Sequence, residues 1–381
     1  MDRAAIIGIG QTKAEGRLKE FNYAELVYPA VVAALEDAGI TIDNIGNIVT
    51  TSNDFWDGRT ISSMATGDVS GAWDRNISCV EGDGAFGAFY GMCRVLSGHY
   101  DTTLVTAYSK GSESVSAYIT NAAFDPIYIR GLGLDMVSAC ALQARRYMSR
   151  YKISEEQCAL VSVKNHRNGL DNPNAHLKLD CSLQDVMNSP MICDPLKLYD
   201  CSPISDGAVA VIFANQKKAK KLGRKPVWVK GVSLCMDTYL LGDRDLAECA
   251  ALTKAAKKAY QSAGISDPRK EIDVAEIYDA FSYQELMWTE GLGFCDRGGG
   301  GRLIESGATG KSGDIPVNPS GGLLASHPVI AAGLIRIAEA VRQVRGEAGR
   351  MQVKEDVRTA LAHGVNGACG QSHCVWILGR E

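Results

Sequence analysis

One sequence pattern occurs twice, once in each half of the chain: an apolar stretch of helical period, a glycine, and then a short apolar run. The members are 24–35, Ala38-Gly39-Ile40 and 45–49 in the first half, and 252–260, Ala263-Gly264-Ile265 and 274–278 in the second. A glycine just after a helical pattern is typical of a helix C-terminus, because glycine adopts left-handed backbone angles without steric cost. The repeat predicts a duplicated α/β unit.

Further elements follow the same order in both halves. They are a helical pattern over 84–96 with an apolar run over 103–107, a helical pattern over 328–344, and closing strands over 208–214 and 374–378. Buried strands alternating with helices predict mixed sheets with helices between and outside them. We therefore expect an N-terminal half over 1–214 and a C-terminal half over 226–381. Residues from about 110 to 195 have no counterpart and predict an inserted loop domain, helical over 136–151 and irregular over 171–195.

The composition is that of a compact globular protein, with 46% hydrophobic and 22% charged residues. A net charge of −4 gives no basic footprint for nucleic acid or for an anionic membrane. No run approaches the 18 apolar residues of a membrane span. Twelve cysteines without a CxxC pair fit a reducing compartment, so we expect a cytoplasmic protein without disulfides. Cys369 and Cys374 flank His373 at a spacing that does not suit zinc, so no metal site is expected.

A duplicated α/β pair brings two equivalent helix N-termini together about a pseudo-two-fold axis. Free backbone N–H groups at a helix N-terminus favour anions and oxyanions. We therefore expect the chemistry near the predicted helix starts at Gly84 and Pro328.

Several motifs, in this order along the chain, resemble the thiolase superfamily, above all its sterol-carrier-protein-x and archaeal branches. They are AIIGIGQTK at 5–13, DCSPISDGA at 200–208, YDAF at 278–281, LGFC at 292–295, PVNPSGGLL at 316–324 and SHP at 326–328. The resemblance implies an α/β thiolase fold, with duplicated βαβαβαββ halves in five layers, α-β-α-β-α. It also implies action on an acyl-CoA thioester at a C–C bond.

His327 is the strongest catalytic candidate. A histidine followed by proline at a predicted helix start lies at the positive end of that helix, which favours the neutral imidazole. A neutral imidazole can donate to a developing enolate oxygen or take a proton from a thiol. The histidine at this place does that work in the family that the chain resembles. The alternative is a histidine near a helix cap that only bonds to backbone.

Tyr278 stands where thiolases of this type carry His or Asn in an HDAF- or NEAF-like motif. A phenol can still donate to a thioester oxyanion, so a catalytic role is compatible with tyrosine. Thiolase-fold steroid retro-aldolases are similar here, which keeps an aldolase interpretation open. The alternative is a tyrosine at a strand end that only packs its ring. Asp279 and Asn318 lie in the neighbouring motifs as candidate supports.

The chain departs from the family at 79–87, where thiolases place a nucleophilic cysteine at a helix N-terminus. Counting back along the helix puts Glu81 at that position, whereas matching Val80-Glu81-Gly82 to the family puts Gly84 there. Neither alignment gives a cysteine, and Cys79 comes two residues early. Gly82 and Gly84 are candidate backbone donors to an oxyanion, and Glu81 is a candidate base. Glu81 and Asp83 also have a structural interpretation, as acids that complement a helix N-terminus.

The segment GACGQSH at 367–373 falls where thiolases have a glycine-rich loop with a second, acid/base cysteine. Cys369 is the candidate for that cysteine, and the N–H of Gly370 could complete an oxyanion hole. His363 and His373 are candidates for support. Gly298 to Gly301 predict a loop and not a phosphate cradle, since no strand-to-helix pattern surrounds them.

These features predict a thiolase-like acyltransferase that cleaves a 3-oxoacyl-CoA with CoA, without the usual nucleophilic cysteine. A retro-aldolase acting on a 3-hydroxyacyl-CoA and a non-catalytic acyl-CoA or lipid-binding subunit are the alternatives. CoA is expected as a substrate, and no tightly bound cofactor is expected. The resemblance implies a homodimer and, for this branch, a small zinc-ribbon/OB-fold partner. The benzoylsuccinyl-CoA thiolase of anaerobic toluene breakdown is similar to this description.

Overall fold

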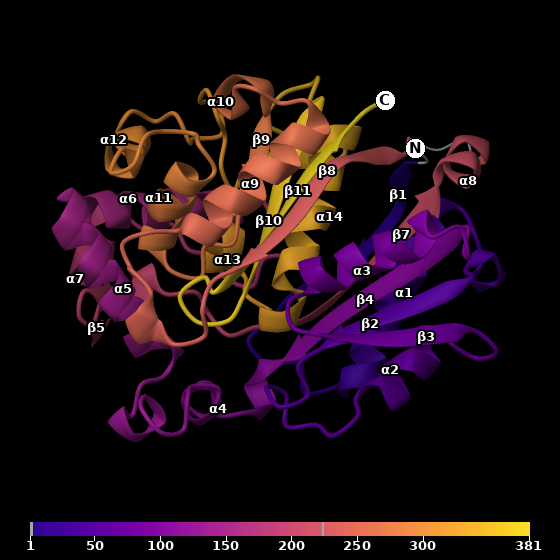
Figure 1. Cartoon of the computed structure of the whole chain (residues 1–381), viewed down its shortest axis with the longest axis horizontal. Helices are drawn as coiled ribbons and strands as arrows, with labels where there is room; N and C mark the ends of the chain where they lie inside the picture. The colour runs from indigo at the N-terminus through magenta and orange to yellow at the C-terminus, as the bar shows by residue number, and fades with distance from the viewer. Residues whose placement is uncertain (1–2, 223–224) are drawn as a thin grey trace.

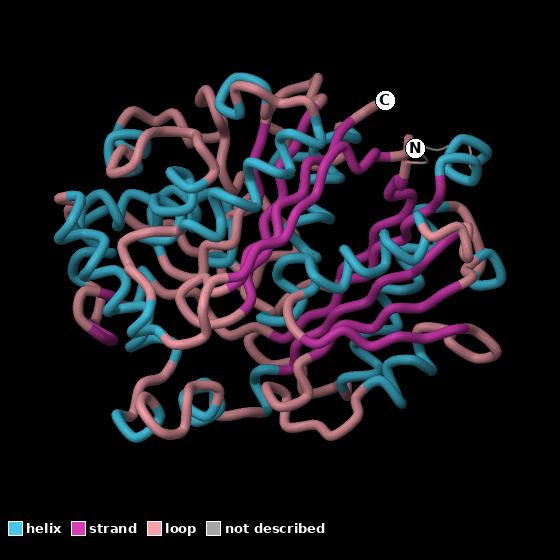
Figure 2. The backbone as a smooth tube through the Cα atoms, in the orientation of Figure 1, coloured by secondary structure: helices cyan, strands magenta, loops and turns pink. Residues whose placement is uncertain are grey.

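The computed structural model describes residues 3–222 and 225–381, and its strands fall into two sets that follow each other along the chain. The first set is β1 (Ala4–Gln11), β2 (Asn47–Ser52), β3 (Asn76–Glu81), β4 (Thr102–Lys110) and β7 (Asp206–Asn215). The second is β8 (Val227–Met236), β9 (Val274–Glu276), β10 (Thr359–Asn366) and β11 (Ser372–Gly379). They run side by side across the molecule (Figure 2).

The strand order confirms the duplication. One half runs β3-β2-β4-β7-β1 and the other continues as β8-β11-β10-β9, so the two orders mirror each other. An isolated parallel bridge between Ala275 and Val317 takes the place of β3 in the second half. The halves meet where β1 pairs with β8, at Ala5–Trp228 and Ile6–Val227, which joins all nine strands into one sheet.

The helices form the remaining layers. In the first half they are α1 (Tyr23–Ala38), α2 (Ser63–Val69) and α3 (Gly84–Leu96). In the second they are α9 (Ala250–Ala263), α10 (Pro268–Glu271), α11 (Ser282–Gly291), α12 (Gly300–Glu305), α13 (Gly322–Ala325) and α14 (Ala332–Arg345), with α8 (Gln216–Lys221) between the halves. Helices α3 and α14 pack on each other between the two sets of strands, while α1 and α9 cover the outer faces (Figure 1). This is the expected five-layer arrangement.

The inserted segment contains α4 (Ser116–Ala122), α5 (Met136–Tyr151), α6 (Glu155–Gly169) and α7 (Leu183–Asn188), with a small sheet of β5 (Met191–Cys193) and β6 (Leu196–Lys197). The prediction of a helix over 136–151 is confirmed, and α7 adds order to the stretch predicted to be irregular. None of the helices in the described residues combines the length and apolar character needed to cross a membrane.

Two helix boundaries differ from the predictions. The four glycines are not a simple loop, because α12 begins at Gly300 and packs against the α11 backbone at Leu286. The second central helix does not begin at Pro328, since a short 3-10 turn occupies Val329–Ala331 and α14 begins at Ala332. Contacts with distant segments set both boundaries.

Candidate active site

A cavity of about 310 Å³ lies between the inserted segment and the loops of both halves. Its walls are mainly apolar, with Ile119 and Phe124 from the α4 region and Val365 from β10. Ser202, Tyr278 and His327 place polar groups in the same cavity. Asp83, Cys140, Cys369 and Gly370 are also among its lining residues. An apolar cavity with a few convergent polar groups is the usual form of a small-molecule site.

Backbone hydrogen bonds bring the three motifs with polar groups together. The N–H of Ser202 donates to the carbonyl of Ala280 at 2.9 Å, which joins the 200–208 loop to the YDAF segment. The N–H of Ser205 donates to the carbonyl of His327 at 3.1 Å, and the N–H of His327 donates to Ser205 Oγ at 3.1 Å. The position of His327 is therefore fixed by the 200–208 loop.

The polar groups form a chain in the order Ser202, His327, Tyr278. His327 Nδ1 lies 2.8 Å from Ser202 Oγ, and His327 Nε2 lies 3.0 Å from Tyr278 Oη. The two rings meet edge to face, with centroids 5.5 Å apart. Because both neighbours of the imidazole are hydroxyls, which donate and accept, either neutral tautomer can be accommodated. The arrangement can pass a proton along the chain.

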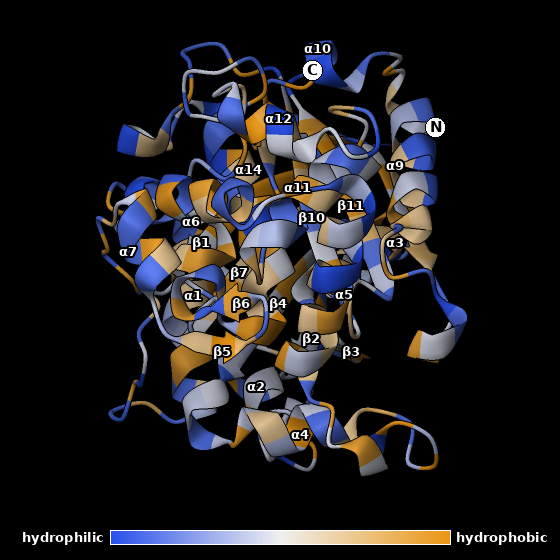
Figure 3. Cartoon of the chain, turned by 90° about the vertical axis from the view of Figure 1, so that its left-hand side faces the viewer, coloured by the Kyte–Doolittle hydropathy of each residue, from blue (hydrophilic) through white to orange (hydrophobic). Residues whose placement is uncertain are grey.

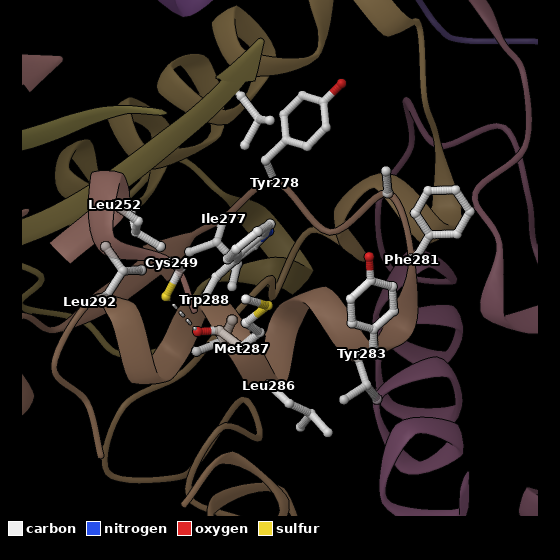
Figure 4. Packing of buried hydrophobic residues seen from close by; sticks show 14 of the residues in the cluster. Cys249, Leu252, Ile277, Tyr278, Phe281, Tyr283, Leu286, Met287, Trp288 and Leu292 are labelled. Atoms are coloured by element: carbon white, nitrogen blue, oxygen red, sulfur yellow. Dashed lines mark hydrogen bonds between the residues drawn. The ribbon is translucent and has the colours of Figure 1, made fainter. Parts of the chain in front are cut away.

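His327 is neutral, as predicted, but for a different reason. The ring is not at the first turn of α14, and burial together with the charge of Arg336 lowers its pKa to about 3. Burial also raises the pKa of the Tyr278 phenol well above its ordinary value. Figure 4 shows Tyr278 at the edge of its apolar cluster, with its hydroxyl pointing away from Trp288 and Met287. Tyr278 therefore keeps its proton and can donate it.

The two central helix N-termini converge, but a protein carboxylate already lies between them. Asp83 is the N-cap of α3, where its Oδ1 accepts the N–H of Ala85 at 2.9 Å. Its Oδ2 accepts the N–H of Gly333, in the first turn of α14, at 2.7 Å. Burial raises the pKa of this carboxyl to about 7, although these hydrogen bonds act in the opposite direction. The group that occupies these helix ends is thus the carboxyl of Asp83 itself.

Gly84 is the first residue of α3, the kind of helix N-terminus at which the resemblance implies a nucleophilic cysteine. A Cβ atom on Gly84 would lie 2.6 Å from the Cβ of Leu334 and 3.2 Å from that of Ala107. Because α3 and α14 approach so closely here, the position has no room for a side chain. The structure favours the alignment that puts Gly84, and not Glu81, at the family's nucleophile position.

The other candidates on this segment do not reach the cavity. Glu81 is exposed at the end of β3, and Cys79 is exposed two residues earlier, with its Sγ 3.6 Å from Ser52 Oγ. The N–H of Gly82, which has a φ of 117°, donates to the carbonyl of Ser52 at 3.1 Å. Gly82 therefore cannot offer that N–H to an oxyanion, and its predicted role is wrong.

The C-terminal loop brings Cys369 and Gly370 to the cavity. Cys369 is buried with a φ of 53°, and its Sγ lies 4.0 Å from the Sγ of Cys140 on α5. Arg244 donates to the carbonyls of Ala368 and Cys369, at 2.8 and 2.6 Å. Its guanidinium thus fixes the loop that carries Cys369.

The remaining candidates support the loop that carries Tyr278. His363 and His373 stack, with Nε2 of the first 2.9 Å from Nδ1 of the second, and the N–H of Tyr278 points to His363 Nδ1 at 3.4 Å. Burial lowers the pKa of both rings, that of His373 to about 3. Asn318 accepts the N–H of Ile277, and Asp279 accepts the N–H of Leu323.

Three residues of the site were missed from the sequence. Ser202 stands in the DCSPISDGA motif, and its place beside the histidine of the SHP motif could have been suspected from their shared family. Cys140 and Arg244 give no local signal, because each acts only through contacts with the distant loop at 368–369. In the described ranges, no cluster of three or more His, Cys, Asp or Glu side chains could hold a metal ion.

Two family descriptions match nearly the whole chain: "Thiolase, N-terminal domain" over residues 3–217 and "Thiolase C-terminal domain-like" over 233–380. A curated acetyl-CoA acetyltransferase of Methanothermobacter thermautotrophicus is 37% identical, covering 97% of this chain and 98% of that protein. The benzoylsuccinyl-CoA thiolase subunit BbsB of Thauera aromatica is 34% identical over 62% of each chain.

Solved structures agree with these matches. The Ltp2-ChsH2(DUF35) aldolase superposes with a TM-score of 0.85 at 26% identity, covering 99% of this chain and 98% of the other. Human mitochondrial 3-ketoacyl-CoA thiolase in complex with CoA gives a TM-score of 0.76 at 15% identity, covering 100% and 98%, which supports the fold alone. On the shared fold, the paired halves and the full-length matches, this chain belongs to the thiolase family.

Proposed function

We propose that this protein is a thiolase-like acyltransferase that cleaves a 3-oxoacyl-CoA with CoA into two acyl-CoA esters. The observation that carries the proposal is the Ser202–His327–Tyr278 chain at an apolar cavity in a thiolase fold. The curated acetyl-CoA acetyltransferase at 37% identity supports an enzyme of this kind. The reaction proceeds without a nucleophile at the start of α3, because Gly84 has no side chain there.

In this proposal Tyr278 donates its hydroxyl to the oxygen on the reacting carbon as negative charge develops. His327 then donates from Nε2 to the phenolic oxygen, and Ser202 supplies the matching hydrogen bond at Nδ1. Because the imidazole titrates only near pH 3, it stays neutral throughout the physiological range. A neutral ring between two hydroxyls can move a proton in either direction without a net change in buried charge.

We propose CoA as a substrate and a homodimer with a small zinc-ribbon/OB-fold subunit as the working assembly. The likeness to an acetyl-CoA acetyltransferase along nearly the whole chain supports the first. The Ltp2-ChsH2(DUF35) assembly supports the small partner. Strand β3 supports the dimer, since it is the edge of the nine-stranded sheet and is largely exposed.

The second candidate is retro-aldol cleavage of a 3-hydroxyacyl-CoA. It is favoured by the likeness to the Ltp2-ChsH2(DUF35) aldolase, at 26% identity, and by a tyrosine in the YDAF motif. This reaction needs a base for the hydroxyl proton and stabilisation of an enolate, but no nucleophile.

The test is product analysis with the purified protein, alone and with any subunit that co-purifies. Two CoA esters from a 3-oxoacyl-CoA plus CoA support the thiolase, and a free aldehyde or ketone from a 3-hydroxyacyl-CoA supports the aldolase. Binding of acyl-CoA without turnover of either ester would support the alternative of a non-catalytic acyl-CoA or lipid-binding subunit. His327→Ala should lower kcat by at least about 100-fold, whereas the control His99→Ala, at an exposed histidine, should not. Normal turnover by His327→Ala would contradict the proposal.

A further inference from the structure

Two cysteines share the inner wall of the cavity. Cys140 comes from α5 and Cys369 from the C-terminal loop, and their Sγ atoms are 4.0 Å apart, within hydrogen-bond range for sulfur. Both side chains are buried, with exposed fractions of 2% each. Gln284 Nε2 also approaches Cys140 Sγ, at 3.9 Å. Gln284 therefore donates to the sulfur of Cys140, and Cys369 lies within hydrogen-bond distance of the same atom.

A buried positive charge lies behind this pair. The Arg244 side chain is 5% exposed, and its closest carboxylate, on Asp237, is 3.9 Å away with only marginal contact. Its two terminal nitrogens donate to the neutral carbonyls of Ala368 and Cys369, and only its Nε faces the Asp237 carboxylate. A cation held near a thiol stabilises the thiolate over the thiol.

The three thiols at the cavity differ in their electrostatic surroundings. Hydrogen bonding from Cys369 and the charge of Arg244 lower the pKa of Cys140, although burial acts against this. Cys201 lines the same cavity, but burial and Asp200 raise its pKa to about 12. The hydrogen bond to Cys140, together with burial, raises the pKa of Cys369 well above its ordinary value.

We propose that Cys140 is the acyl acceptor of this enzyme, with Cys369 donating to its sulfur and Arg244 stabilising the thiolate. The inference rests on the proposed thiolase function and supplies the nucleophile that the first residue of α3 cannot provide. Asp83, which caps α3, lines the same cavity but occupies the N–H groups at that helix end.

The chemistry takes two balanced steps. First, Cys140 sulfur bonds to C3 of the 3-oxoacyl-CoA, and the C2–C3 bond breaks with its electron pair passing to C2. The proton lost by the Cys140 thiol ends on C2, which releases the shorter acyl-CoA and leaves a thioester on Cys140. Second, the CoA sulfur attacks this thioester carbonyl, the bond to Cys140 breaks, and the CoA thiol proton returns to Cys140.

The first test measures thiol reactivity and does not depend on turnover. The full chain is treated with limiting iodoacetamide, and each cysteine is followed by peptide mass spectrometry. Cys140 should be alkylated at least about ten times faster than Cys201, because the thiolate is the reactive form. Arg244→Met should remove this advantage, and Arg244→Lys should restore part of it, since lysine keeps the charge. Equal rates for Cys140 and Cys201 in the wild type would overturn the proposal.

The second test looks for the intermediate. Wild-type protein is mixed with a 3-oxoacyl-CoA in the absence of CoA and quenched, and an added acyl mass is expected on Cys140. Cys140→Ser should lose both the adduct and at least about 100-fold in kcat, while the control Cys193→Ser, on β5 outside the cavity, should keep both. Thiolysis that persists in Cys140→Ser without an adduct would overturn this inference and leave the proposed function standing. A wild type that yields no shorter ester would overturn both.

Discussion

Replacing Asp83 with alanine tests the shared cap of the two central helices. The variant removes the N-cap of α3, which contributes about 0.5–2 kcal/mol. It also leaves the buried N–H of Gly333 without its acceptor, which costs about 1–3 kcal/mol. At a pH where Asp83 is protonated, the two losses together predict a free energy of unfolding lower by about 1.5–5 kcal/mol.

The size of this loss should depend on pH, because burial raises the pKa of Asp83 from 3.8 to about 7 in the folded protein. Between these values the folded state holds a proton that the unfolded state has released, so rising pH favours unfolding. From pH 5 to pH 7 the wild type should lose about 2 kcal/mol through this carboxyl alone. Asp83→Ala has no carboxyl at this position and does not lose this stability as the pH rises. The difference in unfolding free energy between wild type and variant should therefore shrink by about 2 kcal/mol from pH 5 to pH 7.

The assay is urea denaturation of both proteins at pH 5, 6 and 7, followed by circular dichroism. Shifts from the buried histidines occur in both proteins and cancel in the difference. Asn22→Ala serves as the control, because Asn22 caps α1 through an uncharged side chain and its loss should be the same at each pH. A gap between wild type and Asp83→Ala that widens from pH 5 to pH 7 would refute the reasoning, since the ionised carboxylate would then be the stabilising form.

Three further predictions follow from the packing and the polar chain. Gly84→Cys should not create an acyl-enzyme at α3 and should destabilise the fold by about 1–3 kcal/mol through overpacking, as measured by thermal unfolding. The control Gly242→Ala, which has open space around its Cβ, should leave the stability unchanged in the same measurement. A gain of activity in Gly84→Cys would contradict the packing argument. Tyr278→Phe should lower kcat by about 10²–10³-fold with a much smaller change in KM, because the lost donor acts on developing charge; steady-state kinetics in which only KM changes would argue against this role. Arg336→Leu should cost about 3–5 kcal/mol in urea melts, because it leaves Glu276 buried without its 2.5 Å partner; an unchanged midpoint would reject that pairing as a stabilising contact.

Local sequence signals predicted the elements whose ends are set by local chemistry. The helices at 84–96 and 136–151 were predicted with their observed bounds, and each begins after an aspartate that caps it, Asp83 and Asp135. The duplication was predicted from the repeated sequence pattern, whereas the order of the strands within the sheet is known only from the structure. The predicted start of α14 was wrong because of a contact with a distant residue. Ser205 bonds to both the N–H and the carbonyl of His327, which holds the turn before α14 out of the helix.

The residues of the site were predictable only in part. His327, Tyr278, Cys369 and Gly370 were found through their motifs, and the structure brings all four to one cavity. The double role of Asp83 was not visible, since its bond to Gly333 spans 250 positions. Such a contact depends on the close approach of two helices, which no local pattern encodes.

The shared carboxylate at the centre of the fold limits how this protein can open. Any hinge or shear motion that separates α3 from α14 would have to break one of the two buried hydrogen bonds that Asp83 accepts, from Ala85 or from Gly333. These bonds therefore oppose the separation of α3 from α14, whereas the cavity wall formed by the α4 region lies outside them. That segment projects from the rest of the molecule (Figures 1 and 3) and carries Tyr118 and Leu132 at 77% and 73% exposure. A displacement of that segment alone would alter the cavity wall without breaking either hydrogen bond of Asp83.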